Sequence, residues 1–240
     1  MKKFYDRHEL AFAIVWIIVY VNLFSMADNL SREIGIEKLI TFPVSAAMSL
    51  VLLFWLRRHG LFEKYGLCAP KAKARQFLYY LPLLLIVSCN AWFGLQMNMS
   101  GLESLLYVLT MLCVGFLEEL IMRGFLFKAM CRDNVKTAII VSSVTFGIGH
   151  IVNLVNGSGM DLVSNLCQVC YAIAAGFLFV VIFHRGGSLL PCIVCHSGLN
   201  ALSAFGVEAQ GAAGIYVALA LCLISAGYAL ILNKTLPKHE

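Results

Sequence analysis

The chain has 240 residues, of which 60% are hydrophobic and 13% are charged, and its formal net charge is +5. Its mean hydropathy is +0.84, whereas a soluble domain contains roughly 45–50% apolar and about 25% charged residues. Because a water-exposed surface cannot be built from this composition, soluble enzymes, disulfide-rich secreted scaffolds and disordered regulators are excluded. The sequence predicts an integral membrane protein with a single domain over residues 1–240.

Apolar runs of about 20 residues, long enough to cross the hydrocarbon core of a bilayer, recur along the whole chain. Eight such runs predict an all-α multi-pass membrane protein, a bundle of about eight transmembrane helices. Proline near or within some of the runs is compatible with membrane helices. In chain order, the predicted spans are Leu10–Ala27, Leu39–Leu56, Phe77–Leu95, Ser104–Phe127, Thr137–Leu154, Leu162–Phe183, Leu189–Gly206 and Ala213–Leu232.

The basic residues predict the orientation of these spans. If the N-terminus is cytoplasmic, Arg32 and Lys38 lie outside, Arg123 lies within a span, and every other Lys and Arg lies inside. This positive-inside pattern predicts that both termini are cytoplasmic. The basic segment from Arg57 to Arg75 is then a topology determinant that contacts anionic membrane lipid, and no nucleic-acid site is expected. The basic residues on the inside are Lys2, Lys3, Arg7, Arg57, Arg58, Lys64, Lys71, Lys73, Arg75, Lys128, Arg132, Lys136, Arg185, Lys234 and Lys238.

Two pairs among the nine cysteines have the spacing of zinc knuckles, Cys167-x-x-Cys170 and Cys192-x-x-Cys195. Both pairs lie within apolar helical runs and lack the turn residues that a knuckle needs. We therefore expect these thiols to be packing residues, because a buried cysteine behaves as a small hydrophobic side chain.

Five ionisable side chains lie well inside the predicted spans. A charged group at the centre of a bilayer costs at least about 2.5–3.5 kcal/mol, so each of these residues is a candidate for function. The simpler interpretation is a buried ion pair that only holds helices together. The five residues are Glu118, Glu119, Arg123, His150 and His196.

The two neighbouring glutamates have different expected roles. Glu119 and Arg123 are four residues apart on one helix, with the acid first, which predicts an ion pair on one face. Glu118 lies about 100° around the helix from Glu119, so the pair leaves it comparatively free. A desolvated carboxylate beside a second carboxylate is suited to general acid–base chemistry near neutral pH.

The two histidines lie in similar local patterns. Phe146 and His150 are four residues apart, as are His196 and Asn200, so each pair shares one face of a helix. Glycines between Phe146 and His150 leave room for another backbone or a substrate. Counted from the predicted cytoplasmic ends, His196, Glu118 and His150 lie about 10, 14 and 20 Å deep at 1.5 Å per residue. The three side chains can therefore converge.

These motifs resemble the CAAX protease and bacteriocin-processing family, also called the Abi family. The resemblance rests on Glu118-Glu119-x-x-x-Arg123, Phe146-x-x-x-His150 and His196-x-x-x-Asn200, in that order and on separate helices. It covers a core of about residues 104–206, whereas the first three spans match only in hydropathy.

The resemblance implies a glutamate-dependent intramembrane endopeptidase. By analogy, Glu118 and His150 would activate water, and His196 and Asn200 would donate hydrogen bonds to the oxyanion, while Glu119 and Arg123 would orient the site. Stabilising an oxyanion in this way can contribute about 3–4 kcal/mol. No cofactor is expected. An alternative mechanism uses zinc, with Glu118, His150 and His196 as a three-ligand set and an open water position.

Two other classes of function stay open at this point. A proton-coupled membrane transporter could use buried Glu and His side chains as a relay, but it gives Asn200 no task. A non-catalytic bacteriocin-immunity membrane protein would not need the Glu118 carboxylate. For the protease, prenylated C-termini, peptide pheromones and bacteriocin leader peptides are all compatible substrates. The short architecture and basic loops suggest the plasma membrane of a bacterium.

Overall fold

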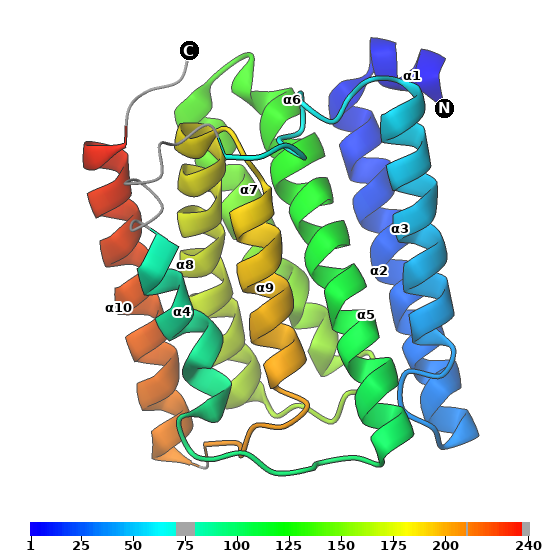
Figure 1. Ribbon diagram of the computed structural model, residues 1–240, viewed down its shortest axis with the longest axis vertical. Helices are drawn as coiled ribbons and strands as arrows, with labels where there is room; N and C mark the ends of the chain where they lie inside the picture. The colour runs from blue at the N-terminus through cyan, green and yellow to red at the C-terminus, as the bar shows by residue number, and fades with distance from the viewer. Residues whose placement is uncertain (71–79, 210, 237–240) are drawn as a thin grey trace.

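A computed structural model describes residues 1–70, 80–209 and 211–236 of the chain. Its regular structure is helical, which confirms the all-α prediction, and the long helices pack side by side with α2 and α3 at one edge and α10 at the other (Figure 1). The elements are α1 (Lys2–Arg7), α2 (Glu9–Ile34), α3 (Thr41–Arg58), α4 (Leu81–Val87), η2 (Ser88–Ala91), α5 (Gly101–Glu119), η3 (Leu120–Phe127), α6 (Lys128–Cys131), α7 (Val135–Gly149), η4 (His150–Leu154), α8 (Leu162–Gly186), α9 (Leu190–Leu202) and α10 (Ala212–Thr235).

The multi-pass character of the protein is confirmed by the length and composition of these helices. In the described part of the chain, five helical segments are long and apolar enough to cross a membrane. Large apolar side chains point outward from the bundle, for example Phe54, which is 66% exposed, and Leu223, which is 74% exposed. Such side chains suit a surface that faces lipid. The five segments are Glu9–Ile34, Gly101–Cys131, Val135–Leu154, Leu162–Gly186 and Ala212–Thr235.

The predicted spans Phe77–Leu95 and Leu189–Gly206 are too long. The described helix of the first ends at Ala91, and α9 has 13 residues, which at about 1.5 Å per residue is shorter than a hydrocarbon core of about 30 Å. Beyond their helices the two segments pair with each other: the amide of Gln96 donates to the carbonyl of Phe205 at 2.7 Å. This pairing satisfies backbone groups that the helices no longer satisfy. Residue 77 itself lies outside the described residues.

Both ends of the described chain lie at one end of the bundle, since α1 and the last turn of α10 are both found there (Figure 1). We call this the N-terminal end. At this end, Oε1 of Glu9, at the start of α2, forms ion pairs with Nζ of Lys64 at 2.7 Å and with Nη2 of Arg132 at 3.0 Å. The arrangement agrees with termini on one side of the membrane, although Lys71, Lys73, Arg75 and Lys238 lie outside the described residues.

Two apolar cores fill the bundle, and the polar side chains of interest lie where the cores meet. The first core is built mainly on α8, α9 and α10, and the second mainly on α2, α3 and η3. Cys195, in the first core, directly precedes His196, whereas Leu117 and Leu120, in the second, flank the two glutamates. The fold therefore brings ionisable residues of different helices together in an apolar interior.

Candidate active site

Five side chains from four helical segments form one polar group inside the bundle. Glu118 and Glu119 end α5, Arg123 follows in η3, His196 lies in the middle of α9, and Tyr20 lies in α2. We call this group the Glu118 cluster. Four of its members belong to the sequence motifs, whereas Tyr20 does not.

Glu119 is the centre of the cluster. Its Oε1 accepts a hydrogen bond from Nη1 of Arg123 at 3.0 Å and lies 2.8 Å from Nδ1 of His196. The side chains of Glu119 and Arg123 are both fully buried, with 0% exposure. The ion pair expected from the spacing is therefore present, and its carboxylate also orients the imidazole of a second helix.

Aromatic rings enclose the guanidinium of Arg123. The ring centroid of Phe146 lies 4.0 Å from Cζ and that of Phe179 lies 5.6 Å away. Phe146 also meets His150 and His196 edge-on, at centroid distances of 5.4 and 5.6 Å. Cation–π contacts of this kind favour a guanidinium that has left water. Phe146 thus links the Arg123 ion pair to both histidines.

Small residues permit the close helix contacts on which the site depends. A Cβ on Gly115 would collide with the backbone of Ser197, so glycine there lets α5 and α9 approach directly beside the two glutamates and His196. Gly147 plays the same part between α7 and α8, where a Cβ would meet the backbone nitrogen of Ile173. Gly149 faces open space, so only one of the two glycines before His150 serves a close contact.

A π-helical segment, η3, begins directly after Glu119 and runs from Leu120 to Phe127. Such segments change the hydrogen-bond register of the backbone and are frequent at functional sites. One hydrogen bond joins this segment to α7: Oγ of Ser142 donates to the carbonyl of Met122 at 2.9 Å. The irregular backbone is therefore supported by a buried side chain from a neighbouring helix.

The two oxygens of Glu118 have different surroundings. Oε1 accepts a hydrogen bond from the Tyr20 hydroxyl at 2.7 Å. Oε2 has no hydrogen-bond partner among the described residues and lies 3.6 Å from Nε2 of His196. The Glu118 side chain is 15% exposed, whereas that of Glu119 is fully buried. Of the two side chains, Glu118 is thus the more exposed, and its Oε2 is a buried atom.

His150 and Asn200 lie beside the cluster rather than in its hydrogen-bond network. His150 is the first residue of η4, is half-buried, and its ring centroid lies 5.4 Å from that of Phe146. Asn200 is half-buried one turn along α9 from His196. Within the described residues no hydrogen bond of its side-chain amide is found. The structure brings Glu118, Glu119, Arg123 and His196 into contact and leaves these two residues at their margin.

The geometry does not fit the three-ligand zinc site considered from the sequence. Among the described residues, no three His, Cys, Asp or Glu side chains are grouped closely enough to hold a metal ion. Nδ1 of His196 is bonded to Glu119, so only Nε2 of that ring faces Glu118, and the His150 ring packs on Phe146. Cys192 and Cys195 are buried in the first apolar core, and the nine cysteines form no disulfide.

A separate recess of about 490 Å³ opens at the other end of the bundle, away from the N-terminal end. Gln96, Asn98, Tyr107, Ser203 and Glu208 are among its lining residues, and no member of the Glu118 cluster is. The recess and the cluster are therefore two distinct places in the fold, and only the cluster contains the residues of the sequence motifs.

Tyr20 and Phe179 are site residues that no sequence motif indicates. Each lies in a long apolar helix in which an aromatic residue is ordinary packing material, and neither stands at a helical spacing from another polar residue. No signal in the sequence distinguishes Tyr20 from other tyrosines, because its partner Glu118 is 98 residues away.

Comparison with known proteins agrees with the motif-based resemblance. Residues 100–202 match the family described as Type II CAAX prenyl endopeptidase Rce1-like. No curated protein and no solved structure gave a significant match. The matched segment contains all six site residues predicted from the sequence, whereas Tyr20 lies outside it. Over this segment the chain is similar to a family that is described as CAAX prenyl endopeptidases, in agreement with the resemblance seen in the motifs.

Proposed function

We propose that the protein hydrolyses a peptide bond in a membrane-associated or lipidated peptide, with water activated by Glu118 and without a metal. The observation that carries this proposal is the carboxylate of Glu118, which has one oxygen held by Tyr20 and the other unpaired among the described residues and 3.6 Å from Nε2 of His196. A general base needs a free oxygen at a fixed position. The family match supports the same class of reaction.

In the proposed reaction, Oε2 of Glu118 takes a proton from water while the water oxygen bonds to the peptide carbonyl carbon. His150 lies beside this water and helps to orient it. In this scheme Nε2 of His196 donates to the oxyanion, together with the Asn200 amide, while Nδ1 stays bonded to Glu119. The C–N bond then breaks as Glu118 returns its proton to the leaving amine, giving a carboxylic acid, which keeps the second proton of the water, and a free amine.

Glu119 and Arg123 act in this scheme by positioning. Glu119 binds Nδ1 of His196 at 2.8 Å, and Arg123 neutralises the buried carboxylate at 3.0 Å. Without this partner His196 would be free to rotate about its side chain. A fixed imidazole matters because oxyanion stabilisation depends on donors that are already in place.

The direct test compares wild-type protein with Glu118→Gln in proteoliposomes, using a quenched fluorescent peptide that ends in a farnesylated Cys-aliphatic-aliphatic-X sequence. We expect cleavage by the wild type and none by Glu118→Gln, since an amide cannot accept the proton. Glu33→Gln, which changes an exposed carboxylate on α2, is the control and should cleave normally. Comparative peptidomics of cells with each variant extends the test to leader-peptide substrates. Unchanged peptide profiles and equal cleavage by all variants would contradict the proposal.

We also propose a bacterial plasma membrane with the N-terminal end of the bundle in the cytoplasm. Most of the described basic residues near helix ends gather at this end, as the positive-inside rule requires. An impermeant thiol reagent should label Val155→Cys, which is 82% exposed at the opposite end, but not Asp133→Cys in the turn after α6. The reverse labelling pattern would invert the topology.

A further inference from the structure

A helix outside the family-matched segment makes a direct contact with the candidate base. Tyr20 of α2 is buried, with 7% exposure, and its hydroxyl donates to Oε1 of Glu118 at 2.7 Å. A tyrosine hydroxyl that has left water needs a partner, and here its partner is a carboxylate from another helix. A hydrogen bond to a charged group is stronger than one between neutral groups.

Ion pairs near both ends of α2 fix Tyr20 along the helix axis. At the N-terminal end, Glu9 pairs with Lys64 at 2.7 Å and with Arg132 at 3.0 Å. At the other end, Nζ of Lys38 bonds both oxygens of Asp28 at 2.9 Å. Because both ends of the helix are held against neighbouring segments, α2 cannot slide relative to α5 without breaking an ion pair.

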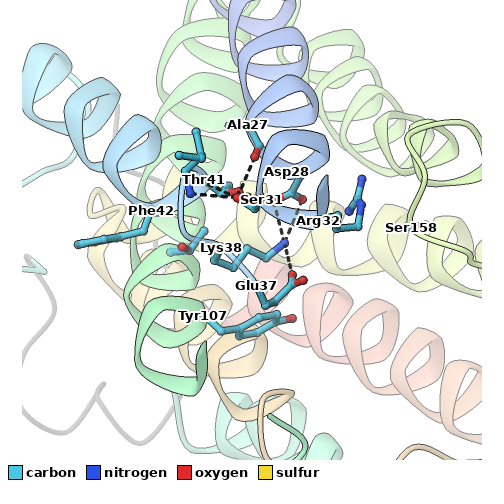
Figure 2. A network of polar contacts seen from close by, with 12 residues as sticks. Ala27, Asp28, Ser31, Arg32, Glu37, Lys38, Thr41, Phe42, Tyr107 and Ser158 are labelled. Carbon is cyan, nitrogen blue, oxygen red and sulfur yellow. Dashed lines mark hydrogen bonds and ion pairs between the residues drawn. The ribbon is translucent and has the colours of Figure 1, made fainter. Parts of the chain in front are cut away.

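Figure 2 shows the second of these anchors, which we call the Asp28 cluster: Asp28, Ser31, Glu37, Lys38 and Thr41. The Thr41 hydroxyl donates to Oδ1 of Asp28 at 2.6 Å, so the start of α3 is tied to the end of α2. The ammonium of Lys38 also lies over the ring of Tyr107 on α5, 5.7 Å from its centroid. The cluster thus joins α2 to the helix that carries Glu118.

Resting on the function proposed above, we infer that Tyr20 is a positioning residue that holds Oε1 of Glu118 and leaves Oε2 as the oxygen that takes the proton from water. The two oxygens are unequal in the structure, since Oε1 has the Tyr20 hydroxyl and Oε2 has no partner among the described residues. A carboxylate held by one oxygen cannot turn freely, so its other oxygen keeps a constant direction toward His196.

The variant Tyr20→Phe separates this positioning role from a purely structural one. If Tyr20 only filled space, phenylalanine would replace it without any effect on Glu118. Tyr20→Phe keeps the ring and removes the hydroxyl. Our inference predicts that kcat on the farnesylated peptide falls about tenfold to a hundredfold, the size expected for one hydrogen bond to a charged group. KM should stay nearly constant. The acidic limb of the kcat profile should move to higher pH by about one unit, because the ionised carboxylate loses a donor.

Infrared titration provides a readout that needs no substrate. Subtracting the spectrum of Glu118→Gln isolates the Glu118 carboxyl band, and its pH midpoint should be higher in Tyr20→Phe than in the wild type. Replacing Tyr20 by 3-fluorotyrosine, a stronger donor of nearly the same shape, should move the midpoint to lower pH. This second variant decides the matter if Tyr20→Phe does not fold. Tyr65→Phe, which removes a buried hydroxyl bonded to Tyr5, is the matched control and should shift nothing.

The outcomes separate this inference from the function on which it rests. If Glu118→Gln is inactive while the Tyr20 variants match the wild type in kcat, pH profile and infrared midpoint, the role of Tyr20 is overturned and the proposed function stands. If Glu118→Gln cleaves normally, the base assignment is overturned whatever the Tyr20 variants do. If the two Tyr20 variants shift the infrared midpoint in opposite directions and Glu118→Gln is inactive, the results support both the role of Tyr20 and the proposed function.

Discussion

The Asp28 cluster and the Glu118 cluster both bury a carboxylate and a cation inside the helix bundle, but they differ in how completely their polar atoms are paired. In the first, Lys38 bonds both oxygens of Asp28 and Thr41 bonds one of them. None of its buried polar side-chain atoms lacks a partner in the described residues. In the second, Oε2 of both glutamates and Nε and Nη2 of Arg123 have none there.

The difference supports the proposed division between buried charges that hold the fold and buried charges that take part in chemistry. A buried polar atom without a partner costs about 1–3 kcal/mol, so a cluster that serves stability alone should satisfy all its atoms. The Asp28 cluster does so. The Glu118 cluster retains unpaired donors and acceptors, which is what a site that binds water and a peptide carbonyl requires. Perturbing each cluster should therefore give different results.

The largest effect is expected for Glu119→Ala. It strands the fully buried guanidinium of Arg123, and losing one partner of a buried pair costs about 3–5 kcal/mol. Yield and melting temperature should fall. Activity should also disappear, because His196 loses the carboxylate that holds its ring in place. The double variant Glu119→Ala with Arg123→Met should recover part of the yield but no activity. If Glu119→Ala stayed folded and inactive while Glu118→Ala cleaved fully, the two glutamates would have the opposite roles.

Lys38→Met should lower stability without comparable loss of chemistry. It leaves Asp28 buried without its cation, and we expect a loss of about 3 kcal/mol, the lower end of the range for a broken buried pair. Turnover per folded molecule should stay close to that of the wild type, because the ion pairs of Glu9 with Lys64 and Arg132 still hold the other end of α2. Thermal unfolding and active-site-normalised kcat measure the two quantities. A large loss of kcat at unchanged stability would remove the distinction between the clusters.

Asn200→Ala tests the oxyanion role at the margin of the Glu118 cluster. Loss of one donor should lower kcat by about 10²–10³ with little change in KM. Stability should be unaffected, since no side-chain hydrogen bond of Asn200 to a described residue is lost. Asn22→Ala on the exposed face of α2 is the control. A raised KM at unchanged kcat would assign Asn200 to substrate binding instead.

Alkaline pH should weaken the Asp28 cluster selectively. Burial alone lowers the pKa of Lys38, but the neighbouring Asp28 carboxylate more than offsets it and holds the pKa above its ordinary value of 10.5. Because the pKa is raised in the folded state, this contribution to stability is fully present below about pH 10.5 and is lost as the pH rises through the folded-state pKa. Melting temperatures of wild type and Lys38→Met should therefore converge above that pH. Parallel curves would contradict the assignment.

Removal of metal ions should have no effect on activity or stability. If Glu118 activates water directly, exhaustive chelation should leave kcat and melting temperature unchanged. Metal analysis of the active protein is the accompanying measurement. One equivalent of zinc in active protein, with activity lost on chelation and restored by zinc, would overturn the metal-free mechanism and require a ligand grouping that is not seen among the described residues.

Local periodicity was enough to predict much of this protein. Composition and apolar runs identified a helical membrane protein, because a bilayer requires long apolar helices. The pairing of Glu119 with Arg123 and the packing of Phe146 on His150 were predictable because each pair lies one helical turn apart. Three short motifs in order indicated the family, and residues 100–202 match it.

Tertiary packing decided the rest. Tyr20 meets Glu118 across 98 residues and His196 meets Glu119 across 77, and such contacts depend on how closely helices approach, which Gly115 permits and no spacing encodes. Lys38, counted only as a basic residue outside the membrane, is buried on Asp28 because the turn after α2 folds back. The short α9 follows from its pairing with the segment after η2. Sequence patterns specify which side chains share one face of a helix. The site depends in addition on which helices pack together and on their relative positions along the bundle axis.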